Sequence, residues 1–372
     1  MKAKLNQQNQ FGSYSEEDVI FLLKDLSNIE LEGKTEDREA NIQKGQHYSE
    51  TLPIEYNPPQ NYLQLFWKTL KLFKEKVALC TAIVAEQIYQ KHGRQTVLVS
   101  LARAGTPIGI LIKRYIQMKY GVNLPHYSIS IIRDRGIDEQ AILFIVNKHK
   151  DFHLQFIDGW TGKGAISIEL TKACQDFTLT YGMELDDTLA VLADPGYCTT
   201  LYGTREDFLI PSACLNSTVS GLVSRTVLNE KYISVGDFHG AKFYKELLPF
   251  DLSNEYLDVI TKELQQIHSE RVKKEVVENI KENEMVDFRG MKEVERIQRE
   301  FQIESTHYVK PGVGETTRVL LRRVPWKILM KDPQSPFVEH IVMLAKERGV
   351  EIIEYPNMSY TCCGLIKRVV DK

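Results

Sequence analysis

The stretch that decides the fold is Phe156-Ile157-Asp158-Gly159-Trp160-Thr161-Gly162-Lys163-Gly164. An apolar run ends here in a carboxylate, and a glycine-rich turn leads into residues 165–170, which favour the start of a helix. This order predicts a strand, a tight loop and a helix N-terminus. Free backbone N–H groups and the helix dipole at such a point suit a phosphate group, and glycine allows its close approach. A tight turn that holds no ligand is the alternative interpretation.

The spacing of this turn argues against a Walker-type nucleotide site. A P-loop places four residues between its first glycine and the Gly-Lys pair, and a serine or threonine follows the lysine. Here two residues separate Gly159 from Gly162-Lys163, and Gly164 stands where the hydroxyl would be. A phosphate bound at this turn must therefore be held by another arrangement.

The composition is that of an ordinary globular protein. The chain has 372 residues, enough for two or three domains, and is 43% hydrophobic and 26% charged. Its net charge of −3 gives no overall attraction to nucleic acid, although residues 301–372 carry a net +3. The six cysteines include no Cys-x-x-Cys pair, and no apolar run approaches the ~20 residues of a membrane span. We therefore expect reduced thiols in a cytoplasmic protein that does not enter a membrane.

Hydrophobic periodicity divides the chain into four segments. We expect an N-terminal adaptor segment over residues 1–60, with a short helix that begins near Ser15 and ends near residue 23. Residues 61–255 alternate strands and helices after one long amphipathic helix. Residues 256–300 favour a solvated connecting helix, and residues 301–372 favour a small second α/β module.

Four polar clusters follow the expected strands of the larger domain. Continuous apolar strands between helices predict a mostly parallel sheet with helices on both faces, and ligands bind such sheets beyond the carboxyl ends of the strands. The expected strands are residues 97–101, 126–132, 154–157 and 189–193. The clusters at their ends are residues 103–106, 133–135, 158–164 and Asp194. Their convergence favours a binding site over four unrelated turns.

The charges of these clusters suit a ligand with more than one phosphate group. Arg103, Arg133 and Arg135 offer bidentate contacts, and Lys163 offers a point charge. Asp158 and Asp194 would bind ribose hydroxyls or Mg²⁺. Because 5-phosphoribosyl-1-pyrophosphate makes these demands together, we expect it or a related ribose phosphate as substrate, with Mg²⁺ as cofactor. For residues 133–135 alone, a solvated hairpin is the simpler interpretation.

Three features in this order resemble the type I phosphoribosyltransferase fold. They are a strand followed by an Arg-x-Gly loop, a strand followed by a charged loop, and a strand followed by an Asp…Thr-Gly turn. The resemblance implies that phosphate is bound by Ala104, Gly105, Thr106, Gly159, Thr161, Gly162, Lys163 and Gly164. It also implies catalytic roles for Asp158 and Arg103. The charged clusters at the strand ends add Arg133 and Arg135 as expected catalytic residues, and Asp158 and Asp194 as expected metal ligands. The family usually shows two adjacent acids, whereas Gly159 follows a single Asp158 here.

The segment Gly312-Val313-Gly314-Glu315-Thr316-Thr317-Arg318 opens an apolar helix and resembles the helix start of Pelota-like RNA-binding domains. That family carries a Gly-x-Asn-Glu-x-x-Lys-like pattern here and contacts RNA through it. Gly314 replaces the asparagine, so the resemblance implies salt-sensitive phosphate contacts with little base selectivity. The implied RNA-binding residues are Gly314, Glu315, Arg318, Arg322 and Arg323. A solvated helix face is the alternative.

The two halves in this order are similar to a bacterial family found in tellurite-resistance and stress-response gene clusters. Residues 158–164 and Tyr360-Thr361-Cys362-Cys363-Gly364 carry this resemblance. We predict a phosphoribosyltransferase that transfers or removes ribose 5-phosphate, with an unidentified acceptor. Because some members are labelled cysteine protease StiP, the alternative is a cysteine hydrolase that uses Cys198 or Cys214 with His239. A non-catalytic RNA-binding stress regulator is a third hypothesis.

Overall fold

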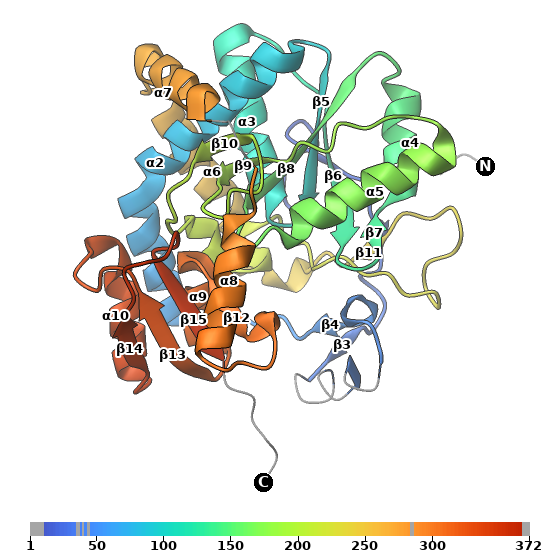
Figure 1. Cartoon of the computed structure of the whole chain (residues 1–372). Helices are drawn as coiled ribbons and strands as arrows, with labels where there is room; N and C mark the ends of the chain where they lie inside the picture. Colours follow the sequence, from blue (N-terminus) through green and yellow to red (C-terminus); the bar gives the residue numbers. More distant parts are fainter. Residues whose placement is uncertain (1–10, 35–37, 39–40, 43–44, 283–285, 367–372) are drawn as a thin grey trace.

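The computed structural model describes residues 11–34, 38, 41–42, 45–282 and 286–366, which form two α/β modules packed together (Figure 1). The larger module is built on a seven-stranded sheet with the order β1-β6-β5-β8-β9-β10. Neighbours in this order are parallel, and β7 adds an antiparallel pairing to β6. The predicted mostly parallel sheet is therefore confirmed. Its strands are β1 (Ile20–Phe21), β5 (Thr96–Ala102), β6 (His126–Ile132), β7 (Gly136–Ile137), β8 (His153–Trp160), β9 (Ala190–Ala193) and β10 (Leu201–Thr204).

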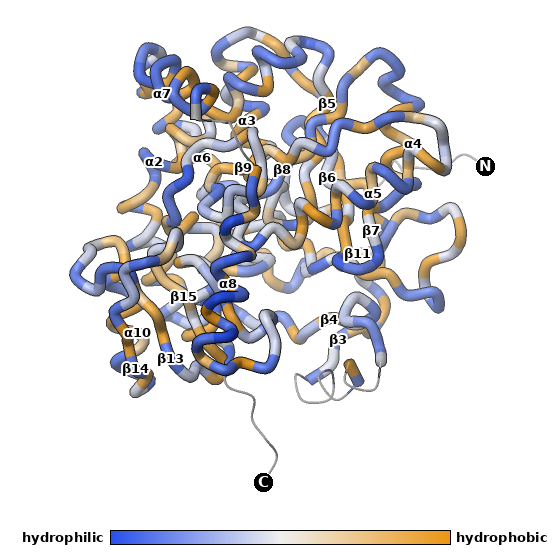
Figure 2. The backbone as a smooth tube through the Cα atoms, in the orientation of Figure 1, coloured by the Kyte–Doolittle hydropathy of each residue, from blue (hydrophilic) through white to orange (hydrophobic). Residues whose placement is uncertain are grey.

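Helices cover both faces of this sheet, as predicted (Figure 1). Because successive side chains of a strand point to opposite faces, β5 gives Leu98 to one core and Val97 and Val99 to the other. Figure 2, in which the backbone is coloured by hydropathy, shows that most residues of the central strands are hydrophobic. One face carries α2 (Gln60–His92), α3 (Gly105–Tyr120) and α6 (Ser253–Leu264). The other carries α4 (Glu139–Lys148) and α5 (Ala165–Tyr181).

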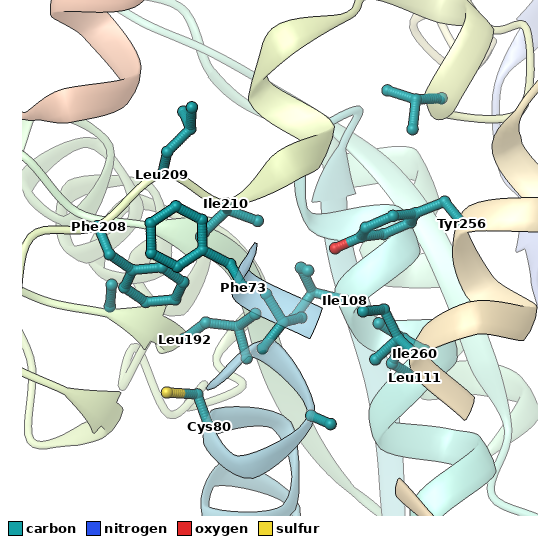
Figure 3. Close-up of a cluster of buried hydrophobic side chains, with 14 of the residues drawn as sticks. Phe73, Cys80, Ile108, Leu111, Leu192, Phe208, Leu209, Ile210, Tyr256 and Ile260 are labelled. Carbon is teal, nitrogen blue, oxygen red and sulfur yellow. The ribbon is translucent and has the colours of Figure 1, made fainter. Parts of the chain in front are cut away.

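The long helix α2 organises the larger of the two cores (Figure 3). Phe73 of α2 packs against Phe208 with ring centroids 5.5 Å apart, and Leu192 of β9 lies in the same cluster. Ile108 of α3 and Tyr256 of α6 complete it from the other side. Burial of such side chains contributes about 1.5–3 kcal/mol each, so α2 fixes the loops that follow β9 and β10.

The C-terminal module is a four-stranded sheet in the order β12-β15-β13-β14. Helix α8 packs on it through Val294 and Ile297, which share a small core with Val309 and Leu329. The strands are β12 (Val309–Pro311), β13 (Pro325–Met330), β14 (Glu351–Glu354) and β15 (Cys362–Ile366). Its helices are α8 (Arg289–Glu300), α9 (Val313–Arg322) and α10 (Glu339–Glu347). Helix α7 (Ser269–Glu282) packs instead against α2 of the larger module (Figure 1).

The N-terminal segment forms two short strand pairs, one with the rest of the chain and one within itself. The strand pairs are β2 (Lys24–Asp25) with β11 (Gly240–Ala241), and β3 (Glu32–Gly33) with β4 (Leu52–Pro53). Within the described residues no helix is long and apolar enough to cross a membrane.

Two expectations from local sequence are wrong. The helix predicted to begin near Ser15 is instead a turn followed by β1, because Ile20 and Phe21 pair with β6. The single solvated helix over residues 256–300 is instead covered by three helices, α6, α7 and α8. Helix α6 is not solvated on its inner face, since Leu257 and Ile260 are fully buried. In both segments, pairing or packing with distant parts of the chain determines the secondary structure.

Candidate functional site

A pocket of about 290 Å³ lies between the carboxyl end of the sheet and the C-terminal module. We call it the inter-module pocket. Its floor is the glycine turn, residues 158–164, together with the first turn of α5. The loop after β5, the loop after β6 and residues 210–220 form further walls. The last wall is β12 with the start of α9. The site therefore needs both modules.

The glycine turn presents the N-terminus of α5 to this pocket. Gly164 occupies the N-cap position with φ of 82°, a left-handed conformation that glycine adopts without strain, and no side chain caps the helix. The first N–H groups of α5 therefore lack intrahelical partners. Ser167 lines the pocket, is 6% exposed, and its hydroxyl has no hydrogen-bond partner among the described residues. These donors suit an anion.

Five cationic side chains line the pocket. Two of them have carboxylate partners: Arg103 lies 3.8 Å from Glu55 and Arg318 lies 3.1 Å from Glu315. Within the described part of the chain, the other three form no ion pair; they are Arg133, Lys163 and Lys310. Burial, helped by the charges of Lys310 and Arg133, lowers the pKa of Lys163 to about 8. The pocket thus has an excess of positive charge.

The loop that carries Arg133 is fixed by its neighbours. The N–H of Arg133 donates to the hydroxyl of Tyr48 at 2.9 Å. Glu169 of α5 accepts from the N–H groups of Asp134 and Gly136 at 2.8 and 2.9 Å. The Nε of Arg133 is buried and has no partner in the described residues. The loop is therefore held in place while part of the guanidinium remains unsatisfied.

The two aspartates predicted to bind metal lie in different environments. Asp158 lines the pocket, and burial raises its pKa to about 6. Asp194 lies behind the turn and already accepts from Thr161, Arg205 and the backbone N–H of Cys198. No cluster of three His, Cys, Asp or Glu side chains occurs in the described residues. Proteins usually bind Mg²⁺ through one or two carboxylates together with substrate phosphates and water, so Mg²⁺ at Asp158 stays a prediction from the sequence.

The structure gathers most, but not all, of the predicted site residues. The pocket is lined by Asp158, Arg103, Arg133, Ala104, Gly159, Thr161, Gly162, Lys163 and Gly164. Besides Asp194, three predicted residues lie elsewhere. Arg135 pairs with Glu50 at 2.7 Å, and Thr106 is fully buried against Ser128. Gly105 allows α3 to pack on β8, since a Cβ there would lie 2.3 Å from a backbone oxygen of that strand.

The residues predicted to bind RNA are divided in the same way. Glu315 and Arg318 line the pocket, and Gly314 lies 3.7 Å, measured from an added Cβ, from Ala213 of the larger module. Arg323 is exposed at the end of α9. The side chain of Arg322 falls outside the described part of the chain. The start of α9 therefore faces the other module.

The two cysteines named in the hydrolase alternative contact different parts of the larger module. Cys198 is 5% exposed, and its Sγ lies 3.8 Å from the carbonyl oxygen of Gly162. Cys214 ends the 3-10 helix η2 (Pro211–Cys214), and its Sγ lies 3.6 Å from the hydroxyl of Thr69 in α2. Burial raises the pKa of Cys198 to about 12, and the charge of Asp194 adds to the rise. The resting thiol is therefore protonated at neutral pH.

The ring of His239 is hydrogen-bonded to β6 rather than to Cys198. Its Nδ1 lies 2.9 Å from the hydroxyl of Ser130 on β6, and burial lowers its pKa to about 4. Cys198 lies beyond the end of β9, three inter-strand steps away in the sheet. Residues 232–235, which precede His239, have no regular secondary structure.

Several residues of the site were not found from the sequence. Ser167 had a usable signal, because it lies in the first turn of the expected helix. Lys310 gave none, since nothing local shows that β12 faces the larger module. Asp207 accepts from the N–H groups of Val313 and Thr361 and joins the modules. Tyr360, whose hydroxyl donates to Gly162 at 3.2 Å, lies in a quoted motif but had no assigned role.

Two family models match the chain. The one described as "Tellurite-like stress resistance cysteine protease StiP" matches residues 12–261, and the one described as "PELOTA RNA binding domain" matches residues 288–368. The chain is also 32% identical over 374 residues to a protein of Acinetobacter baylyi named "Cysteine protease StiP". That alignment covers 96% of this chain and 94% of the relative.

The predicted phosphoribosyltransferase activity on phosphoribosyl pyrophosphate is wrong, because the matching family and the relative are both named for a cysteine protease. The alternative drawn from the sequence, a cysteine hydrolase, agrees with these names. The predicted membership of a stress-resistance family with a Pelota-like module is confirmed. The chain belongs to the StiP family of tellurite-like stress resistance cysteine proteases.

Proposed function

We propose that the chain is a cysteine-dependent hydrolase, that Cys198 is its nucleophile and that the inter-module pocket is its substrate site. The family supports the class of reaction. The observation that carries the choice of nucleophile is the contact of Cys198 Sγ with Gly162, a residue of the pocket floor. Cys214 is less suited, because its thiol contacts Thr69 in the core and the residue is fully buried.

In this proposal Asp194 accepts the proton of the thiol. Its carboxylate oxygens lie 2.9 and 3.0 Å from the backbone nitrogen of Cys198, so they are close to the nucleophile. Burial raises the pKa of Asp194, which makes it a stronger base than a surface aspartate. The thiolate attacks the substrate carbonyl carbon, the C–N bond breaks as the amine takes up the proton, and water hydrolyses the thioester.

The thiol is shielded in the resting protein. A Cβ added to Gly164 would lie 2.7 Å from the ring of Phe288 and 3.0 Å from Cys198 Sγ, so the ring and the thiol share one side of the turn. Phe288 has φ of 48°, a costly conformation for a bulky residue. Substrate access would require Phe288 to move from this contact.

The scaffold itself supports one finer proposal. We infer that the larger module has the type I phosphoribosyltransferase kind of sheet, used here for a different reaction. The glycine turn between β8 and α5 and the polar loops at the strand ends support this inference. Mg²⁺ remains a prediction from the sequence and enters no step of the proposed reaction.

The test is hydrolysis of fluorescein-labelled casein by the full chain and three variants. We expect Cys198→Ser to abolish hydrolysis. Cys214→Ser is the matched control, since it makes the same atomic change in another buried thiol, and it should retain activity. His239→Ala should also retain activity, because the ring is hydrogen-bonded to Ser130 and the proposed base is Asp194. Full activity in Cys198→Ser, or its loss in a folded Cys214→Ser, would reject Cys198 as the nucleophile.

A further inference from the structure

Arg205, the residue after β10, is held in place by hydrogen bonds and by two aromatic rings. Its Nη1 donates to the carboxylate of Asp194 and, at 3.1 Å, to the carbonyl of Thr199. The guanidinium carbon lies 3.6 Å from the ring centroid of Tyr202 and 4.3 Å from that of Tyr197. The side chain is 12% exposed. A guanidinium stacked and bonded in this way has a fixed orientation, so it fixes the carboxylate that it contacts.

The backbone beside this arginine adopts a costly conformation. Tyr197 has φ of 54°, in the left-handed region that bulky residues rarely occupy. Its ring also lies 3.6 Å from the guanidinium carbon of Arg289 at the start of α8. Such strain persists only where surrounding contacts determine the conformation, and it is concentrated at functional sites. Here the strained residue brings an aromatic ring against two cations, one of which contacts Asp194.

The two carboxylate oxygens of Asp194 have different partners. Oδ2 accepts from Arg205, from the N–H of Thr199 at 3.1 Å and from the N–H of Cys198 at 3.0 Å. Oδ1 accepts from the hydroxyl of Thr161 and shares the N–H of Cys198 at 2.9 Å. A carboxylate has about four lone-pair sites, two on each oxygen. Oδ2 is therefore fully used, whereas Oδ1 keeps the capacity to accept a proton.

The charge of Arg205 acts on both partners of the proposed proton transfer. Burial raises the pKa of Asp194, and the positive charge of Arg205 counteracts this rise. Burial and the charge of Asp194 raise the pKa of the Cys198 thiol, which the charge of Arg205 again lowers. Two further groups approach from the C-terminal part of the chain, the Tyr360 hydroxyl beside Cys198 and the Arg289 guanidinium on the Tyr197 ring. Without Arg205, the carboxyl would keep its own proton to a higher pH.

We propose that Arg205 is a positioning residue of the thiol site, which holds Asp194 by Oδ2 so that Oδ1 takes the proton of Cys198. The proposal rests on the proposed function, in which Cys198 is the nucleophile. When the S–H bond breaks and an O–H bond forms at Oδ1, the carboxyl becomes neutral and the negative charge moves to sulfur. No proton passes through Arg205, which keeps its bond to Oδ2 throughout.

The experiment is alkylation of Cys198 by iodoacetamide in the full-length protein, measured by peptide mass spectrometry between pH 5 and 9. A carboxyl that already holds a proton cannot accept that of the thiol, so the rate falls on the acid side of the profile. In Arg205→Met this acid limb should move to higher pH. At a pH on the limb, the rate should fall about 10-fold or more, because one adjacent opposite charge changes the ionisation equilibrium of a carboxyl by at least that factor. Arg205→Lys keeps the charge and should keep the limb near its original position.

Arg289→Met is the matched control, since it removes the same charge from the same aromatic ring. The guanidinium of Arg289 pairs with Asp287 at 3.2 Å rather than with Asp194. The acid limb should therefore stay where it is in Arg289→Met. A purely structural role for Arg205 would instead lower the rate of Arg205→Met by one factor at every pH.

A second background keeps the test decisive if Arg205→Met does not fold, because an unpaired buried carboxylate is costly. Asp194→Asn removes that carboxylate. If Arg205 acts through Asp194, adding Arg205→Met to Asp194→Asn should change the alkylation rate less than about 2-fold.

Three results would overturn the proposal. The first is an acid limb in Arg205→Met that coincides with that of the unmodified protein. The second is an equal displacement of the limb in Arg289→Met. The third is a further 10-fold loss when Arg205→Met is added to Asp194→Asn. Alkylation requires no hydrolysis, so each of these results is distinguishable from a failure of Cys198 to hydrolyse casein.

Discussion

Replacing Asp207 with alanine should loosen the C-terminal module from the larger one. The carboxylate of Asp207 accepts from the N–H of Val313 at 3.0 Å and from the N–H of Thr361 at 2.8 Å. Alanine leaves both donors without these acceptors, at about 1–3 kcal/mol each. The expected loss is therefore about 2–6 kcal/mol of docking free energy. The hydroxyl of Thr361 keeps its bond to the backbone carbonyl of Asp207, so some contact survives.

Hydrogen exchange read by mass spectrometry measures this loss. Amides of α9 and β15 should exchange at least about 30-fold faster in Asp207→Ala, since each 1.4 kcal/mol is a factor of ten. Amides of α5, on the far side of the pocket floor, serve as the internal reference. Unchanged exchange in α9 and β15 would refute the reasoning, because docking would then rest on the apolar contacts between the modules.

The Asp207→Asn variant adds a test of the charge. Burial raises the pKa of Asp207 to about 6 from its ordinary 3.8, so the native state holds this proton more tightly than the unfolded state. The stability that protonation gives is complete below pH 3.8 and is lost as the pH rises toward 6. The shift corresponds to about 3 kcal/mol. Asn cannot titrate, so this part of the fall in stability between pH 4 and 6 should be absent in the variant.

Two further predictions concern the pocket floor. Asp158→Asn should raise the melting temperature of the ligand-free protein by about 2–6 °C at pH 7.5 and leave it unchanged at pH 4, because burial raises the pKa of Asp158 to about 6 and the charged form is the costly one. A rise at both pH values would assign the effect to packing. Phe288→Ala should speed alkylation of Cys198 about 10-fold or more without changing Cys174, as measured by peptide mass spectrometry, since its ring covers the thiol side of the turn. Equal acceleration at both cysteines would indicate general unfolding instead.

The sequence predicted those parts of the fold that local pattern determines. Strand β6 covers residues 126–132 as expected, and β8 enters the glycine turn and α5 in the expected order. Continuous apolar runs, glycines and a carboxylate at the strand end are signals within a few residues of one another. The position of the pocket followed from the same signals, because parallel strands end at one edge of a sheet.

The missing parts depend on contacts between distant segments. Ile20 lies opposite Tyr127 in the sheet, so a segment with helical pattern becomes a strand. Val313 meets Asp207 across 106 residues, and this contact turns α9 inward. No local pattern encodes either pairing. The class of reaction was missed for another reason, since the glycine turn indicates an anion site and says nothing about the bond that is broken.

The C-terminal part of the chain packs against the thiol side of the glycine turn. Tyr360 donates to the carbonyl oxygen of Gly162 at 3.2 Å. The ring of Phe288, just before α8, lies on the same side of the turn as Cys198 Sγ. Movement of the whole module would break both contacts and the bonds of Asp207 to Val313 and Thr361. Movement confined to Phe288 keeps those bonds, so it is the simpler route by which a substrate reaches the thiol.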